Sequence, residues 1–343
     1  MKPLSVGSFA IALLVGACQS GPTAATVSPS AASASQPAAA SASPVMSPST
    51  SPVALNCKLP ISDGTPGSGG FITFPAAQFA ADPSSQVTVP KPGARGRTSF
   101  GLTWDRSLSK WLPVPRDWVS TDGTRYAYPS PDSILVVNAA TGQVIGEYGK
   151  GSAWQPVDLE DGGIYAYQTQ DSTTDPPIPA SGGLWVLPFS GTAHQVENTN
   201  SYFPIAVHGA IFFGILYMSW VGSPYSGTNS LVDWRNLAGN GEGIAFSSGP
   251  NAHFDRFQVV GVDVNGYVFG WADTNELWFA KDNSTMNQLD LGGDTPRYGP
   301  NAYSVLADAN GTWLAGQHGL FLLTGKRLQR VADHSGNLGG GCA

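Results

Sequence analysis

Short stretches in which apolar and polar residues alternate, separated by tight turns, fill the chain from about residue 70 onward. Segments 124–128, 163–167 and 267–271 are examples. A period of two places successive side chains on opposite faces of an extended chain and therefore predicts strands. Turn pairs with Gly second join these stretches, and we expect two-residue hairpins whose central residues both take positive φ. The pairs are Asp122-Gly123, Asp161-Gly162, His208-Gly209, Asn265-Gly266 and Asn310-Gly311.

A second hairpin follows most of the first ones. It is predicted in segments 133–148, 183–196, 276–289 and 319–331, with turns at Thr141-Gly142, Ser190-Gly191, Asn283-Ser284 and Gly325-Lys326. Two hairpins make one unit of four antiparallel strands. The first turns recur about every 47 residues, which is the length of a β-propeller blade.

The 286 residues from Cys57 to Cys342 have room for six such units. Five units are visible from residue 116 onward, and the N-terminal segments 70–74, 99–104 and 110–114 supply strands for a sixth. We therefore expect an all-β protein, a propeller of six blades with four antiparallel strands each.

One blade carries a sequence motif. The run Ser120-Thr121-Asp122-Gly123-Thr124-Arg125-Tyr126-Ala127-Tyr128 resembles the Ser-Pro-Asp-Gly motif of TolB-type and related WD40-like (PD40-type) propellers, with Thr121 where that family has proline. Beyond the repeat, the domain resembles uncharacterised propeller lipoproteins of bacterial envelopes. The resemblance implies a fold and a location, and it brings no activity with it.

The N-terminus has the features of a secretion signal. Lys2 is followed by an apolar stretch over residues 4–17, which is too short to span a bilayer as a helix. Its end, Val15-Gly16-Ala17-Cys18, resembles the lipobox of bacterial lipoproteins. The resemblance implies that residues 1–17 are removed and that Cys18 carries the lipid anchor. The alternative is an ordinary signal peptide with a chance cysteine.

A tether follows the cysteine. Ser, Ala, Pro and Thr make up 29 of the 38 residues in 19–56, and none of the 38 is charged. Such a segment has no apolar face to bury and cannot offset the entropy lost on ordering. We expect residues 18–56 to be a disordered linker and residues 57–343 to be the folded domain.

Two further cysteines, Cys57 and Cys342, stand at the ends of that domain. An even pair in an exported chain predicts a disulfide, which here joins the two termini of the propeller. A metal site is less well supported, because no other Cys or His lies at ligand spacing.

Charge narrows the classes of function. Only 12% of the residues are charged, against about 25% in a typical domain, and long exposed helices are therefore not expected. The net charge of −7 argues against a nucleic-acid partner. We expect a monomer.

A complete catalytic set is missing from the sequence. It contains no hydrolase elbow, no His-Glu-x-x-His, no P-loop and no EF-hand loop. The Asp-x-Asn-Gly runs at 263–266 and 308–311 fit an Asp side chain that bonds its own turn better than calcium. We expect no cofactor and no metal, and we favour a protein without enzymatic activity.

Two long insertions, 168–182 and 218–230, fall on one rim of the predicted propeller, where ligands commonly bind. Candidate ligand residues are Trp220, Tyr225, Tyr217, Trp234 and Asp175. Tyr217 and Trp234 fit core strand positions better, whereas Trp220 and Tyr225 fit either role.

The sequence thus predicts a lipid-anchored, extracytoplasmic propeller on a bacterial cell membrane. We expect it to bind or scaffold an unidentified protein, peptide or glycan without catalysis. The alternative is a carbohydrate-active enzyme or glycan-binding propeller that uses acidic and aromatic residues of the loop-rich rim, since glycosidases need two carboxylates flanking the scissile bond. A pair such as Asp175 with Asp255 leaves this alternative open.

Overall fold

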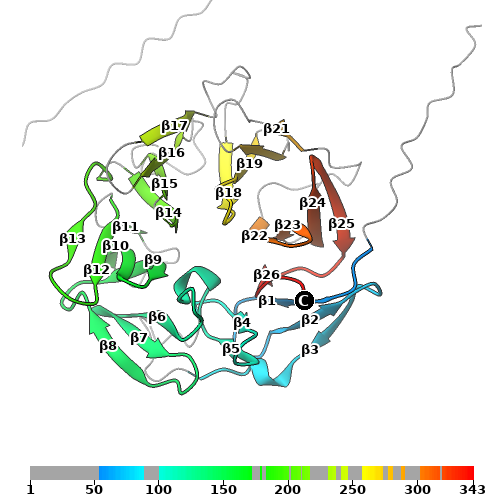
Figure 1. Cartoon of the computed structure of the whole chain (residues 1–343), viewed down its shortest axis with the longest axis horizontal. Coiled ribbons are helices and arrows are strands. Elements are labelled where there is room, and N and C mark those ends of the chain that lie inside the picture. Colours follow the sequence, from blue (N-terminus) through cyan, green and yellow to red (C-terminus); the bar gives the residue numbers. More distant parts are fainter. Residues whose placement is uncertain are drawn as a thin grey trace, which may run out of the picture. The chain divides into compact units, whose positions relative to one another are not determined.

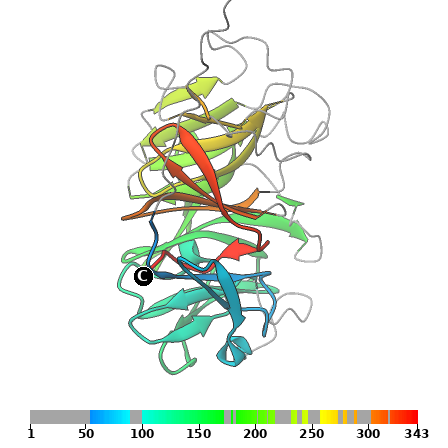
Figure 2. The same cartoon turned by 90° about the vertical axis from the view of Figure 1, so that its right-hand side faces the viewer.

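The computed structural model describes residues 54–88, 100–171, 178–179, 183–200, 202–209, 211–216, 231–236, 241–245, 257–272, 277–280, 287–289, 302–316 and 319–343. Within the compact unit Val53–Ala343, antiparallel sheets stand side by side around a centre (Figure 1) and are seen edge-on in Figure 2. In the described part of the chain, no helix is long and apolar enough to cross a membrane.

Five sheets of four or more strands are the full blades of a β-propeller. Four of them are built from consecutive strands. Their strands are β9 (Trp154–Glu160), β10 (Gly163–Asp171), β11 (Ile178–Pro179), β12 (Trp185–Pro188) and β13 (His194–Gln195); β14 (Tyr202–His208), β15 (Ile211–Leu216), β16 (Leu231–Asn236) and β17 (Gly241–Ala245); β18 (Phe257–Val262), β19 (Val268–Ala272), β20 (Leu277–Ala280) and β21 (Asn287–Gln288); and β22 (Ala302–Asp308), β23 (Gly311–Gly316), β24 (Gly319–Thr324) and β25 (Arg327–Ala332).

The fifth blade joins the two ends of the domain. Its strand order is β26-β1-β2-β3, so the last strand of the chain pairs with the first (Figure 1). The strands are β1 (Lys58–Ser62), β2 (Gly70–Thr73), β3 (Gln78–Ala81) and β26 (Asn337–Leu338).

Two smaller sheets lie between this closing blade and the β9–β13 blade (Figure 1). One is the hairpin of β4 (Thr103–Asp105) and β5 (Lys110–Leu112), and the other has the order β6-β7-β8. The second sheet comprises β6 (Arg125–Ser130), β7 (Ser133–Asn138) and β8 (Val144–Tyr148), to which Val119 adds an isolated bridge. Two 3-10 helices, η1 (Pro83–Ser85) and η3 (Arg116–Trp118), flank the β4–β5 hairpin in sequence.

The prediction of six four-stranded blades is therefore wrong. The strands expected in one N-terminal blade divide between two sheets: β2 belongs to the closing blade, whereas β4 and β5 form their own hairpin. The closing blade is completed by β1, β3 and β26. The β26 strand has two residues, too few for a period-two pattern, and β1 is buried at four of its five positions, so its two faces do not alternate in burial.

In the β14–β17, β18–β21 and β22–β25 blades, two consecutive hairpins follow each other in the predicted order. The predicted geometry of the first turns is wrong, because no Asp or Asn of these pairs takes positive φ, while Gly123 and Gly266 do so at 72° and 80°. The Asp carboxylate holds the turn instead. In Asp263, Oδ1 accepts hydrogen bonds from the backbone N–H groups of Asn265 and Tyr267, both at 2.9 Å.

The core is distributed between neighbouring sheets. One cluster of buried residues, among them Tyr128 and Ile134, joins β5, β6 and β7 to β9, β10 and β12. Another joins the closing blade to the β22–β25 blade and includes Leu55 and Trp313. Leu55 is 5% exposed, so the packed domain includes a residue that precedes Cys57.

Candidate functional site

Most of the ligand residues expected from the sequence lie outside the described residues. Trp220 and Tyr225 of the predicted insertion 218–230, the adjacent Tyr217, and Asp175 of the insertion 168–182 all lie outside the described residues. Trp234 lies in β16 with its backbone opposite Phe213 and Glu242, which agrees with a strand position. Cys18, which the sequence predicts to carry a lipid, is also outside the described residues.

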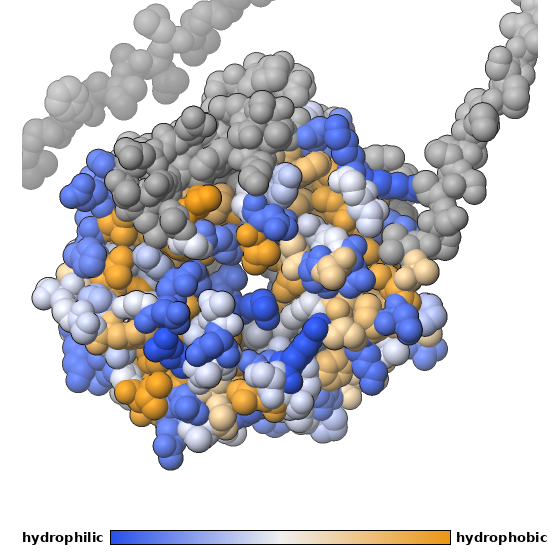
Figure 3. Space-filling view, viewed as in Figure 1, coloured by the Kyte–Doolittle hydropathy of each residue, from blue (hydrophilic) through white to orange (hydrophobic). Residues whose placement is uncertain are grey.

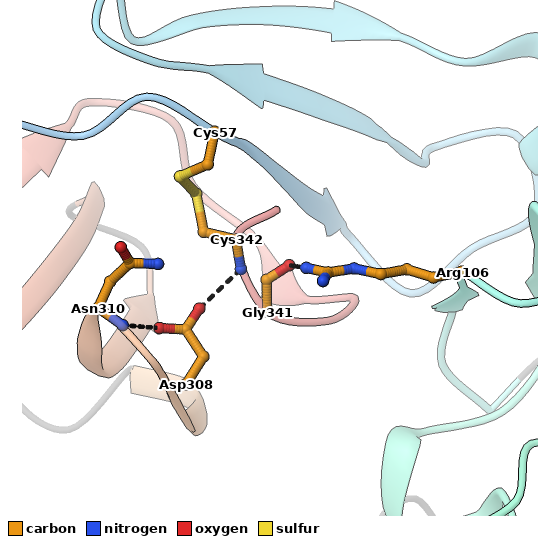
Figure 4. The surroundings of a disulfide bond; sticks show 6 residues. All are labelled: Cys57, Arg106, Asp308, Asn310, Gly341 and Cys342. Atoms are coloured by element: carbon orange, nitrogen blue, oxygen red, sulfur yellow. Dashed lines mark hydrogen bonds between the residues drawn. A yellow bond between two sulfur atoms is a disulfide. The ribbon is translucent and has the colours of Figure 1, made fainter.

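The clasp between Cys57 and Cys342 is confirmed. The two Cα atoms are 5.5 Å apart and the cysteines are bonded through a disulfide (Figure 4). Beside it, Lys58 and Ala343 exchange two backbone hydrogen bonds of 2.7 and 3.1 Å. The side chain of Arg106 donates a 2.5 Å hydrogen bond to the carbonyl of Gly341. The end of the chain is thus fixed from both sides.

A group of carboxylates that the sequence did not reveal lies where η3 packs against β9. We call Asp117, Asp158 and Glu160 the central acid cluster. Asp158 and Glu160 are two residues apart on β9 and therefore share one face of the strand, while Asp117 comes from η3. The β9 strand lies on the inner side of its blade (Figure 1), and hydrophilic residues border the opening at the centre of the ring (Figure 3).

Asp158 has a strongly shifted pKa. Burial, together with the negative charges of Asp117 and Glu160, raises its pKa from 3.8 to about 8. At neutral pH Asp158 therefore keeps a proton that an exposed aspartate would have lost.

Asp117 has a mixed environment. The residue as a whole is exposed. Desolvation by the surrounding protein raises the pKa of its carboxyl group, and the nearby His208 and Arg116 oppose that shift. His208, at the end of β14, brings a third element to the cluster. Its Nε2 atom is buried and has no hydrogen-bond partner among the residues described.

The central acid cluster has no metal-binding geometry. In the described part of the chain, no group of three His, Cys, Asp or Glu residues is arranged to hold a metal ion.

A cavity of about 300 Å³ lies where η1, the β4–β5 hairpin and the β6–β8 sheet meet. We call it the seam cavity. Its lining is largely polar and includes Gln86, Thr88, Lys110, Tyr126 and Thr141. No sequence pattern predicts this cavity, because its lining residues come from four separate segments.

Two side chains determine the chemistry of the seam cavity. The Lys110 ammonium donates hydrogen bonds to the carbonyls of Ala139 and Ala140 at 3.1 and 3.2 Å, which leaves one N–H free to bind a ligand. Tyr126 is 2% exposed, and desolvation raises the pKa of its phenol to about 12, so the hydroxyl stays protonated and can donate. Both groups suit a ligand that accepts hydrogen bonds.

Comparisons with known proteins find distant structural similarities and no family. No family model matches the sequence, and no curated protein matches it. Among solved structures, PorZ, a surface component of the type-IX secretion system of Porphyromonas gingivalis, is 14% identical with a TM-score of 0.41. The alignment covers 80% of this chain and 30% of PorZ.

The acylaminoacyl peptidase of Pyrococcus horikoshii is 10% identical with a TM-score of 0.45, and the alignment covers 77% of this chain and 41% of the peptidase. A chain of a nidogen/laminin complex is 10% identical with a TM-score of 0.43, over 80% of this chain and 89% of that one. This chain thus spans less than half of the first two proteins. Likenesses this distant say nothing of its ligand, and the resemblance to TolB-type propellers stays a prediction.

Proposed function

We propose that this chain is an exported, lipid-anchored β-propeller that binds or scaffolds a partner without catalysing a reaction. The lipobox-like run ending at Cys18 supplies the anchor, and the uncharged segment 19–56 supplies a tether. The propeller supplies a rigid frame, which is a common support for binding sites.

The disulfide between Cys57 and Cys342 carries this proposal. Disulfides persist in oxidising compartments and are rare in the reducing cytoplasm. The bond also joins the two ends of the domain, next to β1 and after β26, the first and last strands of the chain, which pair with each other in the closing blade.

The seam cavity is the proposed binding site for a small ligand. Its volume of about 300 Å³ is at the lower end of small-molecule sites. Lys110 is the charged residue of its lining, and the other polar groups are hydroxyls and amides. This chemistry fits a compact, hydroxyl-rich ligand with one carboxylate, such as an acidic monosaccharide.

Binding is favoured over a carbohydrate-active enzyme. Among the described residues, the seam cavity has no Asp or Glu in its lining, whereas glycoside cleavage needs two carboxyl groups beside the bond that is cleaved. The alternative enzyme would rest on Asp175 and the other rim residues named from the sequence.

Ligand-observed NMR with glucuronate and glucose tests whether the seam cavity binds such a ligand. We expect saturation transfer to glucuronate, weaker transfer to glucose, and loss of the glucuronate signal in Lys110→Gln and Tyr126→Phe. Lys150→Gln is the control, because Lys150 is exposed and pairs with Glu147 at 3.0 Å outside the cavity. Equal signals from all variants would show that the seam cavity is not the ligand-binding site. Release of product from a panel of glycans would favour the alternative, a carbohydrate-active enzyme.

A further inference from the structure

The charge of Lys110 in the seam cavity is held by the turn that joins β7 to β8. The Lys110 ammonium donates hydrogen bonds to the carbonyls of Ala139 and Ala140 at 3.1 and 3.2 Å. None of the ion pairs in the described part of the chain includes Lys110. A free lysine side chain samples many rotamers, so these two carbonyls determine where its charge lies in the cavity.

The turn places both carbonyls on one side. Successive carbonyls point in opposite directions along a strand, whereas in a helical turn they point the same way. The Gly142 N–H donates a 2.8 Å hydrogen bond to the Asn138 carbonyl four residues before it, and Gly142 has a φ of 73°. This is the geometry of a single helical turn ended by a glycine, whose last carbonyls can bind a lysine side chain.

The side chain of Asn138 closes this turn. Its Oδ1 atom accepts hydrogen bonds from the Thr141 N–H at 2.9 Å and from the Thr141 hydroxyl at 3.0 Å. The Asn138 backbone N–H also donates to the Gln143 carbonyl at 2.8 Å. A substitution at Asn138 removes the two side-chain bonds and leaves the backbone bonds available, so it loosens the turn without removing the β7–β8 hairpin.

The two carbonyls are held differently. Ala139 is fully buried, and its N–H donates a 2.8 Å hydrogen bond to the carbonyl of Thr124, just before β6. Ala140 is exposed, so the position of its carbonyl depends on the bonds from Thr141 to Asn138. Asn138 is not among the described residues that line the seam cavity, and it therefore reaches a ligand only through the turn and Lys110.

We propose that Asn138 is a positioning residue of the seam cavity, which fixes the Lys110 ammonium so that its third N–H serves the carboxylate of the ligand. This inference rests on the proposed function and deepens it, because it names how the site distinguishes acidic from neutral ligands. A charge that is already held in place loses little freedom when the ligand binds. Asn138 thus acts on the carboxylate contact and leaves the contacts of the ligand hydroxyls unchanged.

Chemical labelling of Lys110 in the ligand-free protein tests the positioning directly. Acetylation of a lysine requires a neutral amine that is free of its hydrogen-bond partners. Mass spectrometry after brief exposure to an acetylating reagent gives the modified fraction of Lys110, with the exposed Lys150 as internal reference. We expect the ratio of the two to rise at least about threefold in Asn138→Ala, as one lost hydrogen bond implies. It should stay at the wild-type value in Asn138→Asp, which keeps an Oδ1 acceptor.

Binding of glucuronate is the second readout. In ligand-observed titrations, Asn138→Ala should weaken glucuronate binding at least about threefold and leave the weak glucose signal unchanged, because glucose has no carboxylate. Asp263→Ala is the matched control. It removes a turn acceptor of the same kind, which binds the N–H groups of Asn265 and Tyr267 in another blade, and it should leave the reactivity of Lys110 unchanged.

The outcomes separate the positioning from the function. Equal Lys110 reactivity in the wild type and in Asn138→Ala would overturn the positioning, as would the same increase in Asp263→Ala. A reactivity that changes as expected in a protein that does not bind glucuronate would support the positioning and contradict the proposed ligand. If Asn138→Ala does not fold, Asn138→Ser replaces it with a smaller change in the same direction, since a hydroxyl accepts such bonds more weakly.

Discussion

Asp308 binds Cys342 directly: its Oδ2 atom accepts a 2.7 Å hydrogen bond from the backbone N–H of the cysteine (Figure 4). The other oxygen accepts a 2.7 Å bond from the N–H of Asn310, within the turn that joins β22 to β23. One carboxylate therefore shapes its own hairpin turn and also fixes the disulfide clasp of the neighbouring blade.

Removing this carboxylate should weaken the closure of the ring. We expect Asp308→Ala to lower the free energy of unfolding by about 1.5 to 3 kcal/mol, as is typical when a charged hydrogen-bond partner is lost. Urea denaturation followed by Trp fluorescence measures this. Asp333→Ala should change stability by less than about 0.5 kcal/mol, since its side chain is 88% exposed. Equal effects of the two changes would show that Asp308 has no special role.

The disulfide itself should make a large contribution to stability. It closes a loop with a sequence separation of 285 residues. In the chain-entropy model a loop of this length gives at most about 5 to 6 kcal/mol. We expect the double change Cys57→Ala, Cys342→Ala to lower the urea midpoint markedly, and reductant to lower it in the wild type alone. A midpoint that reductant leaves unchanged would contradict this.

Asp122 should matter in the opposite pH range from Asp158. Hydrogen bonds from Ser120 Oγ at 2.7 Å and from the N–H and hydroxyl of Thr124 lower its pKa from 3.8 to about 2. Its contribution is present above pH 4 and is lost as the pH falls through 2. Asp122→Asn should thus be less stable than the wild type at pH 6 and equally stable near pH 1.5.

Acid unfolding curves of the wild type, Asp122→Asn and Asp161→Asn check this. Asp161 occupies the corresponding turn of the next sheet, where its side chain is 88% exposed and lies 3.4 Å from Arg125. We expect the Asp161 variant to follow the wild type. A constant difference between Asp122→Asn and the wild type over the whole pH range would refute the assignment.

Arg125 links two sheets through its guanidinium group. The group lies 4.6 Å from the centre of the Phe189 ring, so β6 is held against the segment that follows β12. A double-mutant cycle with Arg125→Met and Phe189→Leu should give a coupling energy of about 0.5 to 2 kcal/mol. Additive single changes would show that the stacking contributes nothing.

Gly339, the residue after β26, packs closely against the ring of Trp111. A Cβ atom at Gly339 would lie 2.8 Å from Cζ3 of this fully buried ring. Gly339→Ala should therefore cost about 1 to 3 kcal/mol of stability through overpacking. Gly162→Ala is the matched control, because no atom lies within 4 Å of the new methyl group. Thermal unfolding of both variants distinguishes this clash from a general loss of glycine.

The features that the sequence predicts correctly are formed by residues close together in the chain or by a covalent bond. The Asp-Gly turns were found because one carboxylate and the next few N–H groups define them, and the partner of Cys57 followed from the cysteine count. The prediction of positive φ at the Asp residues was wrong. The turn is stabilised instead by hydrogen bonds from backbone N–H groups to the Asp carboxylate, as at Asp122.

What the sequence could not predict depends on distant pairing. The strand β26 has two residues and pairs with β1 at the other end of the domain, so no alternation of apolar and polar residues predicts it. The central acid cluster joins Asp117 to Asp158 across two elements. The closing blade and the cluster both became visible only once the ring was assembled.

The anchor at Cys18 is the part of the account that one experiment tests most directly. Cells expressing the wild type and Cys18→Ser are labelled with a radioactive fatty acid, and the membrane and soluble fractions are compared. We predict label and membrane association for the wild type, and an unlabelled, released protein for the variant. A Cys18→Ser protein that stays with the membrane, or a wild type without label, would contradict the proposed lipid-anchored propeller.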